Sequence, residues 1–433
     1  MRSIIIHKNR NCTINSMNYR ISHPTKKLSG SIQLTASKSE SNRALIIRAL
    51  CEDPFEIKNL ATANDTEVLS AVLELVKNPK DFPVAHDIGA AGTTMRFLTA
   101  YFSALPGTHV LTGSERMKKR PIGILVDALR QLGANITYME NEGFPPLQIE
   151  GKILKGGEVE IDGNVSSQFI SALLLIVPVL QNGLVIRFKG EITSRPYINM
   201  TLKMLEEFGV YGVWQENSIS VSKQNYHTSE DDYVYLIDGD WSAASYWYAF
   251  AALAEEADFT IKGLHHPSLQ GDAILADVFT FFGVKTEFTE EGVHLSKMRV
   301  KDEHFGFDFS DCPDIAQTAA LVVSGLNIPA YFNGLHTLRI KETDRIEALV
   351  AELAKVGVKA EIRNENAIRI GPAAALIQPA SIATYDDHRM AMSFATLAMK
   401  LDSIVIEHPE VVKKSYPSFW EDLKKVGFIV EEC

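Results

Sequence analysis

Residues 346–370 read IEALVAELAKVGVKAEIRNENAIRI, and this stretch contains the unit from which the chain is built. Its first part, 346–356, has the apolar spacing of an amphipathic helix, and Gly357 comes next, where a helix would end in a left-handed residue. The segments 358–362 and 367–370 then alternate apolar and polar residues on either side of a polar turn. The stretch therefore predicts a helix, a glycine stop and a β-hairpin, in that order.

The same unit recurs along the chain at nearly even intervals. Helical patterns at 125–132, 202–208, 274–282, 346–356 and 419–426 end at Gly133, Gly209, Gly283, Gly357 and Gly427, which are 76, 74, 74 and 70 residues apart. A helical pattern at 66–75 lacks the glycine and is placed to begin a sixth unit. Six units of mixed helix and strand predict an α/β fold with mixed sheets, arranged as two groups of three units.

A second kind of helix is predicted between these units. The segments 166–175, 242–252, 315–323 and 388–398 are rich in Ala, Ser and apolar residues, which favours burial on nearly all sides. Each begins with polar residues that can cap a helix, namely Ser166 and Ser167, Asp240, Asp314, and Asp386 with Asp387. Because helix N-termini present free N–H groups and partial positive charge, the same positions also suit phosphate or carboxylate.

The composition limits the function classes. The chain has 433 residues, 46% of them hydrophobic, which is enough for more than one core. Its net charge of −11 gives no general attraction for nucleic acid or for an anionic membrane, and no apolar run reaches the length of a membrane span. The cysteines, Cys12, Cys51, Cys312 and Cys433, form no metal-ligand pattern and predict free thiols in a reducing compartment, the cytoplasm.

The N-terminal region is expected to lie outside the fold. Residues 1–16 are polar after a short apolar start and have no signal-peptide pattern, so we expect a disordered tail there. Either Met1 or Met17 can be the native start, and the sequence leaves this open.

Basic residues cluster beside predicted helix starts. The clusters are SKSESNR at 37–43, GAAGTTMR at 89–96, RMKKRP at 116–121, LRIKETDR at 338–345, DDHRMAM at 386–392 and KKSYP at 413–417. Each cluster alone also fits a capped surface helix, a solvated face or a core ion pair. Together they indicate a site that binds phosphates and carboxylates.

Taken in this order, these segments resemble the 5-enolpyruvylshikimate-3-phosphate (EPSP) synthase family from about Leu28 to the C-terminus. The resemblance implies a two-lobed enolpyruvyl transferase-like fold, with six βαβαββ units in two pseudo-threefold domains. It implies that residues 17–37 and 240–433 form lobe one, and that residues 38–239 form lobe two. The chain would cross between the lobes near residues 37 and 239, and the lobes would close on ligands bound between them.

The resemblance also implies the reaction. The enolpyruvyl group of phosphoenolpyruvate would pass to the 5-hydroxyl of shikimate 3-phosphate and phosphate would leave, through a tetrahedral adduct, on the shikimate pathway to chorismate and aromatic amino acids. No metal and no cofactor are expected. The expected partners are these two small molecules, without nucleic acid or membrane, and the protein is expected to be a monomer.

The resemblance further assigns site residues to positions of this chain. Shikimate 3-phosphate would be bound by Lys38, Ser39, Arg43, Ser166, Ser167, Gln168, Ser194, Tyr197, Asp314, Thr337 and Lys341. Phosphoenolpyruvate would be bound by Lys38, Gly92, Arg120, Gln168, Arg345, His388, Arg389 and Lys414. The expected catalytic residues are Asp314 as base at the hydroxyl and Glu342 as acid toward the methylene carbon, with Lys38 sharing in proton transfer. Which carboxylate protonates the methylene stays open at this point.

The sequence departs from the family pattern at a few positions. Ala90 and Thr337 each stand where Asn is usual, and Phe97 replaces a Pro. One alternative is therefore an anion-binding protein that has lost activity. Another is the sister enzyme that acts on a UDP-amino sugar, but that enzyme typically carries a Cys in the loop that closes on the donor, and residues 111–121 contain none.

Overall fold

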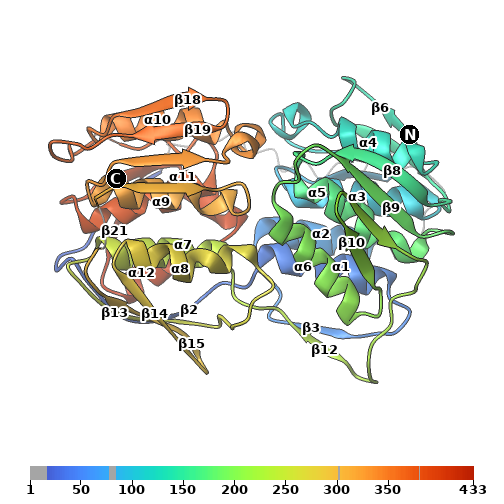
Figure 1. Cartoon of the computed structure of the whole chain (residues 1–433), viewed down its shortest axis with the longest axis horizontal. Helices are drawn as coiled ribbons and strands as arrows, with labels where there is room; N and C mark the ends of the chain where they lie inside the picture. The colour runs from blue at the N-terminus through green and yellow to red at the C-terminus, as the bar shows by residue number, and fades with distance from the viewer. Residues whose placement is uncertain (1–16, 78–83, 301–302, 380) are drawn as a thin grey trace.

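The computed structural model describes residues 17–77, 84–300, 303–379 and 381–433, and it forms two lobes that lie side by side (Figure 1). The tail expected at residues 1–16 lies outside these described residues. Within them, no helix combines the length and the apolar character needed to cross a membrane.

Each lobe has its own hydrophobic core. One buried cluster draws its side chains from residues 21–34 and 241–428, and we call this part lobe one. The other draws its side chains from residues 36–237, and we call it lobe two. The two passages of the chain between the cores run next to each other, since Ala36 and Gly239 form an antiparallel β-bridge. Two backbone bonds flank this bridge, from the Ser37 N–H to the Asp238 carbonyl at 2.8 Å and from the Asp240 N–H to the Thr35 carbonyl at 2.9 Å.

Lobe two is built from helices that cover small sheets. Its helices are α1 (Lys38–Leu50), α2 (Asn64–Val76), α3 (Gly92–Ala104), α4 (Gly123–Gln131), α5 (Ser167–Leu175) and α6 (Arg195–Glu207). One sheet has the order β4-β5-β7-β6, formed by β4 (Val84–Asp87), β5 (Gly107–Thr112), β6 (Asn135–Tyr138) and β7 (Leu147–Gly151). Another has the order β10-β11-β9-β8, formed by β8 (Gly157–Asp162), β9 (Leu184–Lys189), β10 (Gly212–Gln215) and β11 (Ser218–Val221). A third is the parallel pair β3 (Glu56–Lys58) and β12 (Val234–Leu236).

Lobe one repeats this plan. Its helices are α7 (Trp241–Leu253), α8 (Leu275–Phe281), α9 (Ala316–Gly325), α10 (Arg345–Lys355), α11 (His388–Ala395) and α12 (Phe419–Lys425). One sheet has the order β14-β15-β13-β2, formed by β2 (Lys27–Gln33), β13 (Glu256–Lys262), β14 (Val284–Thr289) and β15 (Gly292–Lys297). Another has the order β16-β17-β19-β18, formed by β16 (Phe305–Asp308), β17 (Ala330–Asn333), β18 (Ala360–Asn364) and β19 (Ala367–Ile370). The last has the order β20-β1-β21, formed by β1 (Asn18–Ser22), β20 (Ile404–Glu407) and β21 (Ile429–Glu432).

The predicted glycine stops are confirmed. Helices α4, α6, α8, α10 and α12 each end just before their glycine, and the φ angles of Gly133, Gly209, Gly283, Gly357 and Gly427 lie between 77° and 101°. These are left-handed values that residues with a Cβ adopt at a cost, so each glycine ends its helix and turns the chain into the next strand.

One predicted hairpin is wrong. After Gly427 the chain forms β21, and in the described residues no strand that follows it pairs with it. Instead β21 pairs antiparallel with β1, from Tyr19 opposite Glu432 to Ser22 opposite Ile429. The N-terminal strand therefore supplies the second strand of this unit, a pairing that periodicity within one stretch cannot show.

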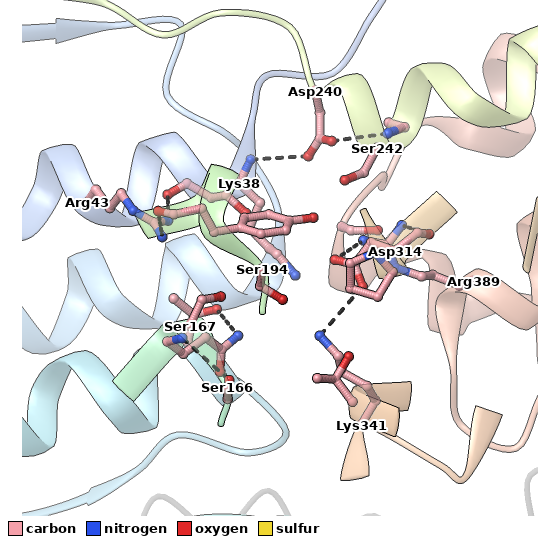
Figure 2. Close-up of a pocket in the computed structure, with 18 of the residues that line it drawn as sticks. Lys38, Arg43, Ser166, Ser167, Ser194, Asp240, Ser242, Asp314, Lys341 and Arg389 are labelled. Atoms are coloured by element: carbon pink, nitrogen blue, oxygen red, sulfur yellow. Dashed lines mark hydrogen bonds and ion pairs between the residues drawn. The ribbon is translucent and has the colours of Figure 1, made fainter. Parts of the chain in front are cut away.

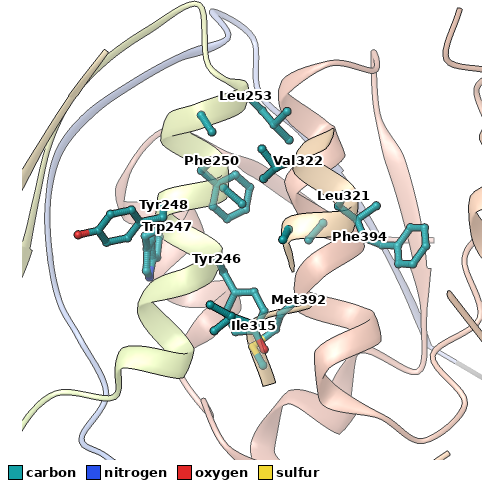
Figure 3. Close-up of a cluster of buried hydrophobic side chains, with 14 of the residues drawn as sticks. Tyr246, Trp247, Tyr248, Phe250, Leu253, Ile315, Leu321, Val322, Met392 and Phe394 are labelled. Atoms are coloured by element: carbon teal, nitrogen blue, oxygen red, sulfur yellow. The ribbon is translucent and has the colours of Figure 1, made fainter. Parts of the chain in front are cut away.

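The small-residue helices lie inside the lobes. In lobe one, α7 packs against α9 and α11, and side chains such as Phe250, Leu321 and Met392 fill the space between them (Figure 3). In lobe two, α1, α3 and α5 pack together in the same way. The outer helices and the sheets surround these inner helices, whose N-terminal ends carry the side chains of the candidate site.

Candidate active site

The site lies between the lobes, and many of its residues lie at the N-terminal ends of the inner helices (Figure 2). Lys38 and Ser167 are first residues of α1 and α5, and Asp240 is the N-cap of α7. Free N–H groups and the positive ends of helix dipoles therefore converge on one cleft, which favours anionic ligands.

Two adjoining cavities occupy this cleft. All eleven residues that the family resemblance assigns to shikimate 3-phosphate line the larger cavity. The smaller cavity is lined by seven of the eight residues assigned to phosphoenolpyruvate, and the exception is Lys414. Both cavities are lined by Lys38, Thr93, Gln168, Asp314, Lys341 and Arg389, so two ligands bound there would meet at these side chains.

The cavity lining carries an excess of positive charge. The described residues that line the two cavities include six cations, Lys38, Arg43, Arg120, Lys341, Arg345 and Arg389, and four carboxylates, Asp65, Asp240, Asp314 and Glu342. Buried charges need partners, so this excess indicates that the cleft is completed by anions.

Arg43 is a buried cation on the lobe-two side. Its guanidinium donates to the Thr201 hydroxyl at 2.7 Å, the Ser171 hydroxyl at 2.9 Å, and the carbonyls of Ser39 and Tyr197. These partners are neutral, and no carboxylate in the described ranges forms an ion pair with it. Burial lowers the pKa of Arg43 to about 10, which leaves it charged at neutral pH and in need of an anion.

Hydroxyl and amide groups surround this cation. Ser166 caps α5 by accepting from the Gln168 N–H at 3.4 Å, and the Gln168 amide donates to the Thr93 hydroxyl at 3.1 Å. Ser194 has a left-handed backbone with φ of 55°, which turns the chain at the start of α6. These groups can donate several hydrogen bonds to a phosphate held by Arg43.

Asp314 is the central carboxylate on the lobe-one side. One oxygen lies 3.1 Å from Arg345 and 3.5 Å from Lys341, and the other lies 2.8 Å from Arg389. Burial alone would raise the pKa of Asp314, but Arg389, Lys341 and Arg345 outweigh burial and hold the pKa far below its ordinary value. Asp314 is therefore ionised in this arrangement, and it becomes a stronger proton acceptor only as these cations gain other partners.

The prediction that Asp314 caps its helix is wrong. Asp314 lies inside a short turn, Pro313–Ile315, and α9 begins at Ala316 without a side-chain cap. Its carboxylate is drawn instead to the neighbouring arginines. The caps predicted at Ser166, Asp240 and Asp387 are confirmed, since each side chain accepts from a backbone N–H of its helix.

Glu342 is the second buried carboxylate. It pairs with Lys414 at 2.7 Å, with Arg345 at 2.8 Å, and more distantly with Arg120 at 3.9 Å. Burial would raise the pKa of Glu342, but Lys414, Arg345 and Arg120 together hold the pKa well below its ordinary value. Glu342 is therefore ionised in this arrangement and can act as an acid only after these cations gain other partners. Lys414 reaches the site through this pair, although it does not line the smaller cavity.

Gly92 leaves room for a guanidinium. A Cβ on Gly92 would lie 2.5 Å from one terminal nitrogen of Arg120, which is closer than atoms can approach. Arg120 is buried, and its Nε has no hydrogen-bond partner within the described ranges. The glycine thus lets Arg120 lie flat against the start of α3 and face the smaller cavity.

His388 is a neutral group in the same cavity. Burial, and then the charge of Arg389, lower the pKa of His388 well below its ordinary value. Neither ring nitrogen has a hydrogen-bond partner in the described part of the chain, so the imidazole is free to contact a ligand.

Several lining residues are not among those that the family resemblance assigns. Thr93, Asp240, Ser242, Tyr246 and Ser415 line the larger cavity, and Asp65 lines the smaller one. Asp65 is buried and lies 3.6 Å from the ammonium of Lys38. The sequence marks Asp240 as a helix cap. Thr93 and Ser415 lie within the clusters at 89–96 and 413–417, and Ser242 begins a predicted helix. Asp65 and Tyr246 reach the cavities through helix packing that spacing does not reveal.

The positions that depart from the family pattern also have roles in the structure. The backbone carbonyl of Ala90 accepts from Lys414 at 3.0 Å, a contact that does not depend on the side chain. The Phe97 ring lies under Arg43, 5.6 Å from the guanidinium carbon, which favours the charged form by a cation–π contact. The Thr337 hydroxyl is buried without a partner among the described residues and lines the larger cavity.

Comparisons with known proteins identify relatives of this chain. The model of the family described as EPSP synthase (3-phosphoshikimate 1-carboxyvinyltransferase) matches residues 22–423. A protein of Bacteroides fragilis (strain YCH46) named 3-phosphoshikimate 1-carboxyvinyltransferase is 49% identical over 418 residues, which cover 95% of this chain and 98% of that protein. A protein of the same name from Sulfurovum sp. (strain NBC37-1) is 40% identical and covers 93% of this chain and 98% of its own length.

Solved structures share the fold at low sequence identity. An EPSP synthase from Acinetobacter baumannii is 21% identical with a TM-score of 0.77, covering 96% of this chain and 100% of that chain. The enolpyruvyl transferase NikO from Streptomyces tendae is 14% identical with a TM-score of 0.73, covering 96% of this chain and 99% of that chain. The predicted two-lobed enolpyruvyl transferase-like fold is confirmed.

Proposed function

Because this chain belongs to the EPSP synthase family, we propose that its larger cavity binds shikimate 3-phosphate and its smaller cavity binds phosphoenolpyruvate. The reaction is the transfer of the enolpyruvyl group from phosphoenolpyruvate to the 5-hydroxyl of shikimate 3-phosphate, with release of phosphate, and it serves aromatic amino acid biosynthesis. We assign some side chains of the two cavities to substrate binding and others to the proton transfers of this reaction.

The observation that carries the assignment is the excess of buried cations shared between two touching cavities. Arg43 lines only the larger cavity and has neutral partners, so we assign it the phosphate of shikimate 3-phosphate. Arg120 and Arg345 line the smaller cavity beside the open backbone of Gly92, so we assign them the phosphate and carboxylate of phosphoenolpyruvate. Lys38, which lines both, lies where the two substrates would meet.

Asp314 is our candidate for the base. It is ionised, it lines both cavities, and it is held by cations from three directions. In the addition step the hydroxyl oxygen bonds to C2 of phosphoenolpyruvate while its proton passes to this carboxylate. Lys341, 3.5 Å from Asp314, would hold the hydroxyl in line for this attack.

Glu342 is our candidate for the acid toward the methylene carbon. Its three cations keep it ionised in the arrangement described above, so a proton donor at this position needs a trigger. We propose that the phosphate and carboxylate of phosphoenolpyruvate supply it, because they compete for Arg120, Arg345 and Lys414. As the cations turn to the substrate, the pKa of Glu342 rises and the carboxyl can take up the proton that it delivers. In the elimination step it takes a proton back from the methyl group as the bond from C2 to the phosphate oxygen breaks, and the departing phosphate takes the proton held by Asp314.

Closure of the two lobes would exclude water from the adduct. We propose that residues 17–37 with 240–433, and residues 38–239, are the bodies that move. The paired crossings at Ala36 and Gly239 support a hinge between them. Contacts across the cleft support a closed form, among them the Ser194 N–H to the Ser310 carbonyl at 3.0 Å and the Tyr197 hydroxyl to Asp272 at 3.2 Å.

We also propose that the protein works as a monomer in the cytoplasm. The residues lining both cavities come from one chain, which supports a site that needs no second copy. Of the cysteines in the described ranges, Cys51, Cys312 and Cys433 are free thiols, which supports a reducing compartment. Sedimentation equilibrium tests the monomer, and fractionation of the native cells tests the compartment.

Equilibrium titration tests the substrate assignment. We expect Arg43→Gln to lose most of its affinity for shikimate 3-phosphate in the absence of the donor, because a buried phosphate partner is removed. Arg48→Gln, further along α1, lines neither cavity and serves as the control. Wild-type affinity in Arg43→Gln would refute this assignment.

A further inference from the structure

Arg116 reaches across the cleft from lobe two to the backbone of lobe one. Its Nε donates to the carbonyl of Glu342 at 2.7 Å, and a terminal nitrogen donates to the carbonyl of Lys341 at 2.7 Å. We propose that Arg116 is a positioning residue, which fixes the 341–342 backbone when the lobes close and thereby aims Lys341 and Glu342 at the substrates. The proposal rests on the roles proposed above for these two residues.

Apart from the bonds from Arg116, the backbone carbonyls of Lys341 and Glu342 lack hydrogen bonds from other backbone groups in the described ranges, although both side chains form ion pairs. Lys341 and Glu342 lie between a 3₁₀ turn, His336–Ile340, and the start of α10 at Arg345, in a stretch without helix or strand structure. No backbone N–H in the described ranges donates to either carbonyl. Asp344 caps α10 by accepting from the N–H groups of Ile346 and Glu347, so the cap does not satisfy the carbonyls of residues 341 and 342. Those two carbonyls accept hydrogen bonds from Arg116.

The arginine side chain is suited to donating both of these hydrogen bonds. A guanidinium offers N–H groups from two nitrogens in a fixed fork, which matches two successive carbonyls, whereas an ammonium donates its three N–H groups from one nitrogen. Arg116 is exposed at the rim of the cleft and forms no ion pair with any described residue. Its contact with lobe one can therefore form and break as the lobes close and open.

The loop that carries Arg116 acts on Glu342 twice. Arg120, four residues later, faces the Glu342 carboxylate at 3.9 Å, while Arg116 holds its carbonyl. One loop of lobe two thus orients both the backbone and the charge of the candidate acid. The substrate-binding groups on α1 and α5 belong to other elements and do not depend on this contact.

Steady-state kinetics with matched variants test the proposal. We expect Arg116→Ala to lower kcat by about tenfold to a hundredfold, the effect of a misplaced catalytic group, and to raise KM for phosphoenolpyruvate. The dissociation constant for shikimate 3-phosphate alone should stay within about twofold, because its subsite is untouched. Arg116→Lys keeps the charge but not the fork, so it should be slowed nearly as much. Lys119→Ala, an exposed cation of the same loop, should match wild type.

A double-variant cycle shows whether Arg116 acts through Glu342. If it does, Arg116→Ala combined with Glu342→Gln should be little slower than Glu342→Gln alone. The proposal is overturned if Arg116→Ala keeps wild-type kcat, if Arg116→Lys restores it, or if the Arg116→Ala loss multiplies in full both with that of Glu342→Gln and with that of Lys341→Gln. If instead the proposed role of Glu342 is wrong, the Glu342→Gln variant alone should keep the wild-type kcat, which distinguishes that failure from a failure of the Arg116 proposal.

Discussion

The ammonium of Lys414 lies 2.7 Å from a carboxylate oxygen of Glu342 and 3.0 Å from the carbonyl of Ala90, so one lysine of lobe one ties the candidate acid to lobe two. This contact helps to hold the pKa of Glu342 low, against the effect of burial. The site is thus arranged so that the same cations that stabilise the carboxylate are those that the donor substrate would claim.

Replacing Glu342 should separate binding from turnover. We expect Glu342→Gln to bind both substrates but to lower kcat about a hundredfold or more, because the proton donor is gone. Calorimetric titration and phosphate-release kinetics measure the two effects. Glu347→Gln, on the exposed side of α10, is the matched control and should be unaffected. Full activity of Glu342→Gln would remove Glu342 from the mechanism.

Replacing Asp314 should abolish the base. Asp314→Asn keeps the shape but cannot accept the proton, so kcat should fall by about a hundredfold or more. The affinity for phosphoenolpyruvate should rise or stay equal, because Arg345 and Arg389 lose a competing carboxylate. Single-turnover measurements at saturating substrates check the first effect and equilibrium titration checks the second. Wild-type turnover in Asp314→Asn would exclude it as the base.

A methyl group at Gly92 should disturb Arg120. Since the added Cβ would lie 2.5 Å from the guanidinium, Gly92→Ala must displace Arg120 from its position at the start of α3. We expect KM for phosphoenolpyruvate to rise about tenfold or more, with little change in the affinity for shikimate 3-phosphate. Gly306→Ala, where the new Cβ would meet nothing closer than 3.9 Å, should leave both constants unchanged. An unchanged KM in Gly92→Ala would show that Arg120 does not contact the donor.

The buried Glu40 should make stability depend on pH. Burial raises the pKa of Glu40 from 4.5 to about 7, and its carboxyl accepts a hydrogen bond from the Tyr235 hydroxyl at 2.9 Å. The folded chain therefore holds a proton there that the unfolded chain releases, so this group's contribution to stability falls as the pH rises from about 4.5 to 7.

Glu40→Gln removes this penalty. We expect the variant to be more stable than wild type at about pH 8, by on the order of 3 kcal/mol, and to differ little near pH 4. Urea unfolding of both proteins at the two pH values measures this. The same stability difference at both pH values would contradict the titration of Glu40.

The local features of the fold could be predicted from the sequence, because each depends on neighbouring residues. Gly357 ends α10 with a left-handed backbone, and Asp240 and Asp387 cap their helices as their positions indicate. The pairing of β21 with β1 could not be predicted in this way, since it joins segments that lie far apart in the sequence.

The same distinction applies to the site. The clusters containing Lys38, Arg345 and Arg389 are visible in the sequence because several charges lie close together along the chain. Asp65 and Tyr246 reach the cavities through the packing of separate helices, and no local pattern marks them as site residues. The sequence pattern predicts Asp314 as a helix cap. Its actual orientation is explained only by three cations that are far from it in the sequence but pair with it in the structure.

Phosphate release from phosphoenolpyruvate in a metal-chelated buffer, with either shikimate 3-phosphate or a UDP-amino sugar as the acceptor, tests the proposed reaction most directly. We expect release with shikimate 3-phosphate alone, at a rate that chelation does not change. Release with the UDP-amino sugar, or no release with either acceptor despite measurable binding, would contradict the proposed reaction.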